Sequence, residues 1–169
     1  ENSVSTIEHL MAALYASGVD NALIRVNAPE VPILDGSSKL WLEAINATGL
    51  TEQKAEKDFY VVKHKIELAD EATGSKIPIL PDDEFSVEVK VNFESPVLSN
   101  QYASMEHINE FETEIAGART FVFVREIEPL VRAGYIKGGD LDNAIVIYDS
   151  PLSQESLDKI ADTMGVEHH

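Results

Sequence analysis

The spacing of apolar residues predicts two short helices near the start of the chain. Between residues 5 and 17 the apolar side chains recur every three or four positions, as on one face of a helix. Ser5 is a typical N-cap residue, and Gly18 can adopt the left-handed conformation that ends a helix. We expect a second helix between Ser38 and Gly49, because its apolar residues also share one face: Leu40, Trp41, Ala44 and Ile45.

Alternation of apolar and polar residues predicts strands elsewhere. Residues 22–27 indicate a short strand, which is followed by a proline-containing loop that ends in Asp35-Gly36-Ser37-Ser38. After residue 58 the apolar residues repeat every second position, in 60–68 and again in 84–93. We expect these two segments to pair antiparallel in one sheet. The apolar face of the second should then be buried beneath a helix at 108–116: Phe85, Val87, Val89 and Val91.

The remaining pattern completes a mixed architecture. We expect a strand at 120–124, a helix at 125–133 closed by Gly134, and a buried strand at 143–148. Together these elements predict an α+β fold, a two-layer sandwich of mainly antiparallel sheet and helices. The polar stretch 51–58 lacks apolar periodicity, so we interpret it as a linker between residues 1–50 and residues 59–169.

Composition narrows the possible functions. The chain has 169 residues, a net charge of −17 and no Cys. The negative charge argues against binding to nucleic acid or to an anionic membrane. Without Cys, any metal site would need His and carboxylate ligands. We find no apolar run long enough to span a membrane and no basic-then-apolar signal segment, and we therefore expect a soluble, cytoplasmic protein.

The dipeptide Glu8-His9 has two interpretations. Ser5-Thr6-Ile7-Glu8 fits a capping box, in which the glutamate side chain bonds back to the backbone at the helix start. Alternatively, the first helical turn presents His9 as a metal ligand and Glu8 as a general base, as a zinc amidase requires. No His-Glu-x-x-His motif accompanies the pair, so residue chemistry by itself favours capping.

Two later features are also ambiguous when taken alone. Thr120 opens a predicted strand, where a buried threonine usually serves structure through a local hydrogen bond. Gly138-Gly139 indicates flexible backbone and lacks the context of a dinucleotide-binding fingerprint. No serine lies in a Gly-x-Ser-x-Gly setting, and nucleophilic serine catalysis therefore has no support.

Read together, several sequence blocks are similar to one enzyme family. These blocks lie in the family's order along nearly the whole chain: Val4 to Leu14 (VSTIEHLMAAL), Asp20-Asn21, Asn27 to Ser37 (NAPEVPILDGS), Ala118 to Phe121 (ARTF) and Gly138-Gly139. They closely resemble the UDP-3-O-acyl-N-acetylglucosamine deacetylases, the zinc amidases of lipid A biosynthesis. The first and third blocks are the most specific.

This resemblance implies a fold and a reaction. It implies two similar α+β domains with the active site between their helical layers, and hydrolysis of an acetamide on a UDP-sugar lipid by zinc-bound water. Carried over residue by residue, Glu8 matches the general base, His9 matches the first zinc ligand, and Thr120 matches the residue whose hydroxyl stabilises the oxyanion. The resemblance therefore reverses the preference for capping at Glu8.

The resemblance also implies positions that bind the substrate. Residues of about 122–142 match an insertion that forms a passage for the acyl chain, and Val124, Ile127 and Gly139 fall at its lining positions. Phe121 is expected to contact the substrate, and Phe93 matches an aromatic residue that stacks on uracil. Asn92 stands where relatives often carry Asp, a departure that affects the polar contact to uridine.

Part of the family's site has no match in these residues. The family takes its other two zinc ligands from a downstream His-x-x-x-Asp helix and uses a later His as general acid. We therefore expect a central piece of the enzyme, with residues 1–50 as the C-terminal part of the first domain and residues 59–169 as the N-terminal part of the second. We expect this piece to be inactive alone and without retained zinc. The alternative is a non-catalytic module that binds a lipid or a partner. Fusion of the parent to a hydroxyacyl-carrier-protein dehydratase, as in some relatives, stays open.

Overall fold

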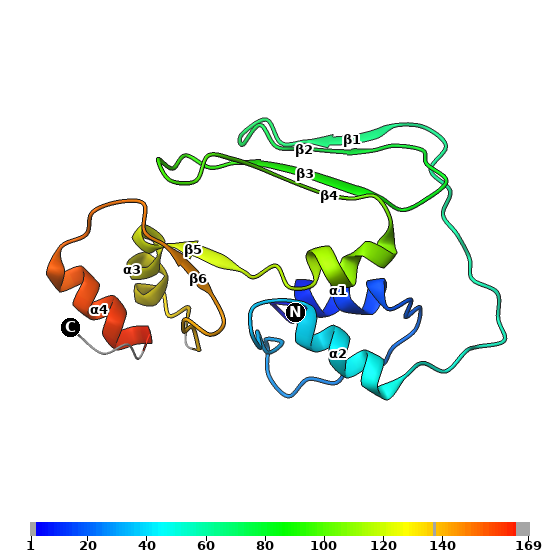
Figure 1. Cartoon of the computed structure of the whole chain (residues 1–169), viewed down its shortest axis with the longest axis horizontal. Helices are drawn as coiled ribbons and strands as arrows, with labels where there is room; N and C mark the ends of the chain where they lie inside the picture. Colours follow the sequence, from blue (N-terminus) through cyan, green and yellow to red (C-terminus); the bar gives the residue numbers. More distant parts are fainter. Residues whose placement is uncertain (1–2, 137, 165–169) are drawn as a thin grey trace.

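The computed structural model describes residues 3–136 and 138–164, and it has the predicted α+β fold. Helices α1 and α2 lie below two β-hairpins, and a second group of elements follows at one side (Figure 1). The elements in chain order are α1 (Glu8–Ala16), α2 (Lys39–Thr48), β1 (Ile66–Ala69), β2 (Lys76–Ile79), β3 (Val87–Asn92), β4 (Asn100–Met105), η1 (Ile108–Glu110), η2 (Phe111–Ile115), β5 (Phe121–Phe123), α3 (Val124–Arg132), β6 (Ile145–Ile147) and α4 (Gln154–Met164).

Helix α1 begins later than the sequence predicts. Ile7 occupies the N-cap position without a side-chain hydrogen bond, so the expected cap at Ser5 is wrong. Ser5 instead forms a β-bridge with Glu30, and Thr6 takes a left-handed conformation with φ 56°. The Thr6 hydroxyl donates a hydrogen bond of 2.5 Å to the Glu30 carboxylate, which holds the chain in this turn. At the other end, Gly18 has the expected positive φ of 73°.

The expected strand at 22–27 is absent from the structure. These residues are exposed and irregular, because no neighbouring segment among the described residues offers them a ladder of backbone hydrogen bonds. Helix α2 lies where the apolar spacing predicts it and ends at Gly49, which has φ 76°.

A buried cluster joins the first part of the chain to the second. Ala13 of α1 and Leu42 of α2 pack against Met105, at the end of β4, and against Phe111 and Ala116, in and just after η2. The 108–116 segment was expected to be one helix, but it forms a 3-10 turn followed by a π-helical turn. Its buried side faces the two helices, and this packing fixes α1 relative to the strand that follows.

The predicted pairing of the long strands is wrong. Strand β1 covers only the end of the predicted 60–68 strand and pairs antiparallel with β2, while β3 pairs antiparallel with β4. The sequence pattern did not predict β2 or β4. The local hairpin connections compete with pairing between β1 and β3, and they produce two separate two-stranded sheets.

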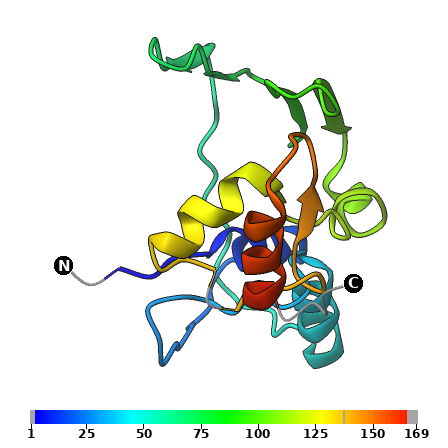
Figure 2. The same ribbon diagram turned by 90° about the vertical axis from the view of Figure 1, so that its left-hand side faces the viewer.

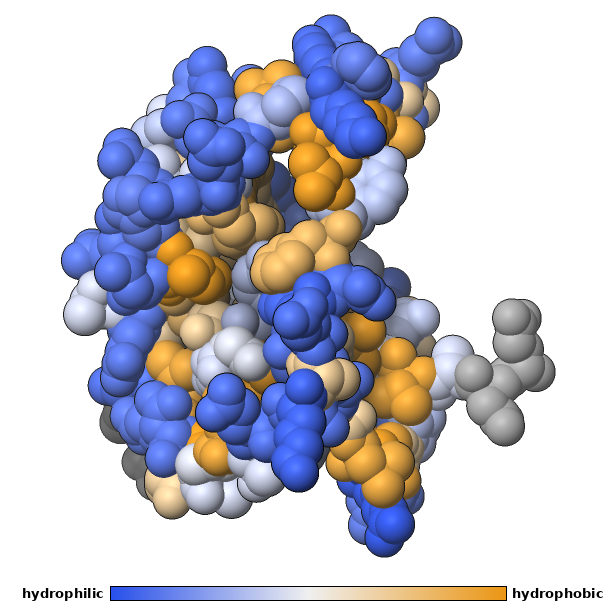
Figure 3. Space-filling model, turned by 90° about the vertical axis from the view of Figure 1, so that its right-hand side faces the viewer, coloured by the Kyte–Doolittle hydropathy of each residue, from blue (hydrophilic) through white to orange (hydrophobic). Residues whose placement is uncertain are grey.

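Burial of the β3 apolar face is also not observed. Val87, Val89 and Val91 are 36%, 45% and 38% exposed, because the 108–116 segment packs against α1, α2 and Met105 at the end of β4 and does not cover the valines of β3. Apolar (orange) surface is visible on the face shown in Figure 3, between polar regions. Leu68 and Ile77 of the first hairpin are exposed as well.

The last group of elements is a strand–helix–strand unit with an added helix. Strands β5 and β6 pair in parallel, as expected when a crossover helix, here α3, connects them. Val124 and Ile127 of α3 pack against Ile160 of α4. The two helices lie next to each other in Figure 2. Helix α4 was not predicted, although Ser153 before it and the three-residue spacing of Leu157 and Ile160 are helix signals.

Two further predictions concern the linker at residues 51–58 and the expectation that no segment spans a membrane. Residues 51–58 are exposed and form neither helix nor strand, but the division at this segment into two domains stays a prediction. In the part of the chain that the structure describes, no helix has the length and hydropathy needed to cross a membrane. His168 and His169 lie outside the described residues.

Candidate functional site

Glu8 and His9 form the first turn of α1. Glu8 Oε1 lies 3.7 Å from His9 Nε2, while 67% of the Glu8 side chain and 16% of the His9 side chain are exposed. Glu8 is the first helical residue and not the third, so a capping box is geometrically unavailable to it. This removes the structural alternative for Glu8 and leaves a solvent-accessible carboxylate beside a largely covered imidazole.

Thr120 lies immediately before β5 and is held through its backbone. Its N–H donates to the Gly36 carbonyl at 2.7 Å, and its carbonyl accepts from the Ile145 N–H at 3.0 Å. Among the described residues its hydroxyl has no hydrogen-bond partner, so the local bond expected of a structural threonine is not made. The hydroxyl therefore remains available to a ligand.

The Asp35–Ser38 loop connects the α1 turn that carries Glu8 and His9 to the start of β5, where Thr120 lies. On one side, the Ser38 hydroxyl donates to the His9 carbonyl at 2.9 Å. On the other side, Gly36 accepts from Thr120, and the Arg119 Nε–H donates to the Asp35 carbonyl at 2.9 Å. The α1 turn and the start of β5 are thus tied to one short loop.

The interior of this loop is stabilised by its own polar groups. The Asp35 carboxylate accepts from the Ser37 N–H at 3.1 Å and from the Ser37 hydroxyl, which is fully buried. Gly36 has φ 78°, and a Cβ there would collide with the Asn143 carbonyl oxygen. Sequence reasoning identified these residues only as a loop; the run Asp-Gly-Ser-Ser was the available signal.

Three phenylalanines gather where β3 approaches β5. Phe93 lies edge-on to Phe121 and Phe123, with ring centroids 5.2 and 5.7 Å away. Two predicted substrate contacts, Phe93 and Phe121, are therefore in mutual contact although they are distant in sequence. Phe123 was missed, but its period-two spacing from Phe121 in the strand could have indicated it.

An ion pair with a buried carboxylate supports this aromatic cluster. The Arg125 guanidinium pairs with the Asp149 carboxylate, whose side chain has no exposed surface, and it stacks 4.5 Å from the Phe123 ring centroid. Burial of a carboxylate without a partner is costly, and the guanidinium offsets this cost. Asp149 follows β6, and Arg125 is the second residue of α3, which follows β5 directly. The pair therefore fixes both strand ends, a role that the sequence did not reveal.

The predicted acyl-passage residues occupy two environments. Val124 and Ile127 are 3% and 1% exposed, within the cluster that Ile160 covers. Gly139 lies in the loop before β6, where a Cβ would collide with the side chain of Ile136. Lys137, within the predicted 122–142 insertion, lies outside the described residues. The roles of these residues in binding an acyl chain stay predictions.

The metal-ligand set is incomplete among these residues. The described residues contain no group of three or more His, Cys, Asp and Glu side chains that could hold a metal ion. A catalytic zinc ordinarily takes three protein ligands. His9 can supply one imidazole, but the described residues alone do not fit a complete zinc site.

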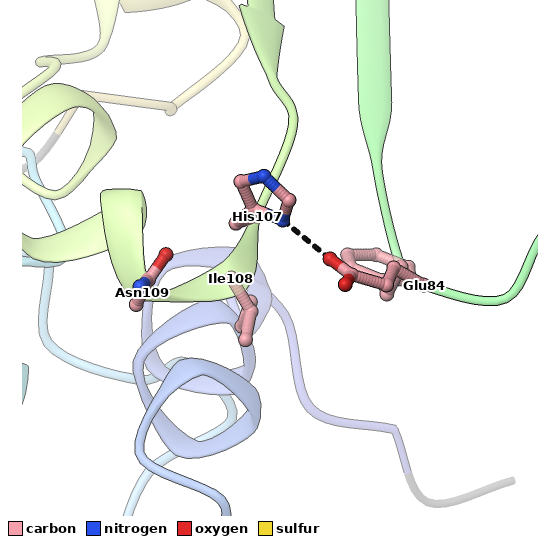
Figure 4. A pocket seen from close by; sticks show the side chains of 5 residues that line it. Glu84, His107, Ile108 and Asn109 are labelled. Atoms are coloured by element: carbon pink, nitrogen blue, oxygen red, sulfur yellow. Dashed lines mark hydrogen bonds and ion pairs between the residues drawn. The ribbon is translucent and has the colours of Figure 1, made fainter.

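A separate pocket lies between the β3 hairpin and η1. Glu84, Phe85, His107, Ile108 and Asn109 line it, and the Glu84 carboxylate pairs with His107 Nδ1 (Figure 4). This contact with Glu84 raises the pKa of His107 above its ordinary value. None of these residues belongs to the predicted site, and the pocket carries no predicted function.

Comparison with known proteins agrees with the resemblance. The family model described as "UDP-3-O-acyl N-acetylglycosamine deacetylase" (LpxC) matches residues 1–164. The "Bifunctional enzyme LpxC/FabZ" of Bacteroides thetaiotaomicron is 60% identical over 98% of this chain and 36% of its own length. The protein of the same name from Porphyromonas gingivalis is 59% identical over 99% and 36%.

A relative that is named as a deacetylase alone, and not as a bifunctional enzyme, also matches this chain. The "UDP-3-O-acyl-N-acetylglucosamine deacetylase" of an Anaeromyxobacter species is 42% identical over 91% of this chain and 51% of its own length. The chain thus spans about a third to a half of the length of the curated relatives that it matches. Because the family model matches residues 1–164 and relatives are up to 60% identical over nearly the whole chain, the chain belongs to the UDP-3-O-acyl N-acetylglycosamine deacetylase family.

Proposed function

We propose that the complete protein containing this chain hydrolyses the N-acetyl group of a UDP-3-O-acyl-N-acetylglucosamine in lipid A biosynthesis. One observation carries the proposal: the Asp35–Ser38 loop ties both the Glu8-His9 turn and Thr120 to the same frame. Two groups suited to amide hydrolysis, a carboxylate and an unbonded hydroxyl, are thereby attached to one loop.

Each group has a distinct chemical task in this proposal. Glu8 accepts a proton from water as the water oxygen forms a bond to the acetamide carbonyl carbon. The Thr120 hydroxyl donates a hydrogen bond to the carbonyl oxygen as that oxygen gains negative charge. The C–N bond then breaks, the proton taken from water is delivered to the leaving nitrogen, and the products are acetate and a free amine on the sugar.

His9 is proposed as one ligand of a catalytic zinc. Its imidazole is largely covered by protein, and Glu8 lies beside it at 3.7 Å, as a metal ligand and a neighbouring base would. Zinc would supply Lewis-acid chemistry, and its other ligands would belong to parts of the complete protein that this chain does not span. The isolated chain is therefore expected to be inactive and to retain no zinc.

The substrate-binding assignments follow the aromatic cluster and the strand–helix–strand unit. Phe93 offers a ring for stacking on uracil, and the adjacent Phe121 is 40% exposed, so it can contact the sugar or the lipid. Val124, Ile127 and Gly139 are proposed to border the path of the acyl chain. The buried state of Val124 and Ile127 means that only the edge of their cluster is accessible to a ligand.

Replacement of His9 by Ala in the complete gene product tests the proposal. Deletion of a metal ligand should lower both the zinc content of the purified protein and its release of acetate from the substrate. Phe59→Ala is the control, because Phe59 is exposed and far from the loop in sequence. Unchanged zinc content and turnover in His9→Ala would remove His9 from the site.

The alternative is a non-catalytic module that binds a lipid or a partner, which the exposed apolar hairpin residues favour. Under this alternative the complete gene product would release no acetate even when supplied with zinc. We also propose a fused second enzyme, a hydroxyacyl-carrier-protein dehydratase, because two close relatives are named as bifunctional. A UDP-sugar substrate is consistent with a cytoplasmic location.

A further inference from the structure

Ser38 uses its side chain in an unusual way for a residue at a helix start. It occupies the N-cap position of α2, yet its hydroxyl makes no capping hydrogen bond. The hydroxyl donates instead to the His9 carbonyl on α1, a residue 29 positions away in sequence. The neighbouring Ser37 oxygen accepts the Lys39 N–H at 3.1 Å and so satisfies one donor at the start of α2.

The backbone of Ser38 binds in another direction. Its N–H donates to the Ala116 carbonyl at 3.1 Å, just after η2, and its carbonyl accepts from Leu42 within α2. Only 7% of Ser38 is exposed, so these bonds are largely protected from competing water. Ser38 is therefore bonded at once to α1, to α2 and to the segment that leads into β5.

We propose that Ser38 is a positioning residue, which holds the Glu8-His9 turn in register with Thr120 through the Asp35–Ser38 loop. This inference rests on the function proposed above for those three residues. The connection is short: the Ser38 hydroxyl holds the His9 carbonyl, and two residues earlier the Gly36 carbonyl holds the Thr120 N–H.

The expected consequence concerns geometry at the reacting atoms. Loss of the hydroxyl leaves the Ser38 backbone bonds in place but frees the first turn of α1 to shift relative to β5. Displacements of about 1 Å from remote changes can reduce rates by about 10²-fold, and a loosened turn should cost less than a fixed displacement. Substrate affinity should change little, because Ser38 is buried within the loop and not among the aromatic residues.

The test replaces Ser38 by Ala in the complete gene product. We expect kcat to fall about 10-fold while KM changes less than about 2-fold, since alignment and not binding is lost. The backbone amides of residues 9–13 should exchange hydrogen about 5-fold faster, because one hydrogen bond to this turn is gone. Amide exchange reports the α1 turn directly, independently of turnover.

Ser17→Ala is the matched control. Ser17 also has a buried hydroxyl at α1, but that oxygen has no hydrogen-bond partner among the described residues. The same substitution should leave kcat and the exchange of residues 9–13 unchanged. If both variants lose activity equally, general destabilisation of α1 explains the result and the proposal is overturned.

Two further variants keep the test decisive if Ser38→Ala does not fold. Ser38→Thr retains the hydroxyl donor, and Ser38→Cys replaces it with a weak S–H donor. We expect kcat to decrease in the order Ser, Thr, Cys; full kcat in a folded Cys variant overturns the proposal. The proposed function fails separately if the wild-type protein releases no acetate, and the positioning role then fails with it. Activity in the wild type with unchanged Ser38→Ala kinetics overturns the positioning role alone.

Discussion

Gly36 and Gly18 offer a matched pair for testing how tightly the Asp35–Ser38 loop is built. Their φ angles are 78° and 73°, so replacement by Ala places an L-residue at an unfavourable positive φ in both. The space around them differs. A Cβ at Gly18 meets no heavy atom within 4 Å, whereas one at Gly36 would lie well under 3.0 Å from the Asn143 carbonyl oxygen and 3.2 Å from the Thr120 Cγ2.

These geometries give different stability losses. Left-handed strain costs an L-residue about 1–2 kcal/mol, and this cost is common to both variants. At Gly36 the collision adds about 1–3 kcal/mol of overpacking, because the obstacle is backbone. Asn143 cannot move aside easily, since its side chain donates to the Gly138 carbonyl at 2.7 Å and accepts from the Asp140 N–H at 3.0 Å.

Thermal unfolding of the complete gene product compares the two variants. We expect Gly36→Ala to be less stable than Gly18→Ala by about 2 kcal/mol, a difference of about 4–8 °C in Tm for a unit of this size. Acetate release should also fall in Gly36→Ala, because the Gly36 carbonyl binds Thr120. Equal Tm values for the two variants would refute the close packing of Gly36 against Asn143.

Two further predictions concern charged pairs. Because Glu84 raises the folded-state pKa of His107 above 6.5, the stability from their contact is fully present below pH 6.5 and is lost as pH rises through the raised value. The Tm advantage of wild type over Glu84→Gln should therefore be larger at pH 6 than at pH 9; an advantage that grows with pH contradicts this sign. Asp149→Asn should lower stability by about 1–3 kcal/mol in urea unfolding, because it leaves the Arg125 guanidinium without its buried partner. Wild-type stability in Asp149→Asn would show that this pair contributes nothing.

Local sequence signals were sufficient for most helices of this fold. Apolar spacing and the terminal glycines predicted α1, α2 and α3, since a helix satisfies its backbone hydrogen bonds within itself. The start of α1 was wrong because Thr6 adopts a left-handed turn. A hydrogen bond to Glu30, remote in sequence, supports that turn, and no local pattern reports it.

Strand pairing could not be predicted in the same way. Alternation identified the apolar faces of β1 and β3, but a strand's partner is a non-local choice that the pattern leaves open. The structure pairs each of them with a following strand, β2 or β4, that the pattern did not reveal. Their exposed apolar faces show that alternation predicts a face able to be buried, not what covers it.

The residues of the candidate site also differ in whether the sequence could identify them. Motif resemblance identified Glu8, His9 and Thr120, because their residue types and order are visible in the sequence. It did not identify Ser38, whose contribution depends on a hydroxyl reaching a backbone carbonyl on another helix. Such contacts arise from tertiary structure, and a serine in a loop carries no signal of them.

The central claim is that Glu8 is a general base and not a structural residue of the α1 turn. Its most direct test is kcat of Glu8→Gln in the complete gene product, measured at saturating substrate alongside Tm. We predict a kcat loss of about 10²–10⁴-fold with Tm nearly unchanged, because the exposed carboxylate makes no capping bond. Near wild-type kcat in a folded Glu8→Gln protein would contradict the account and place the base elsewhere.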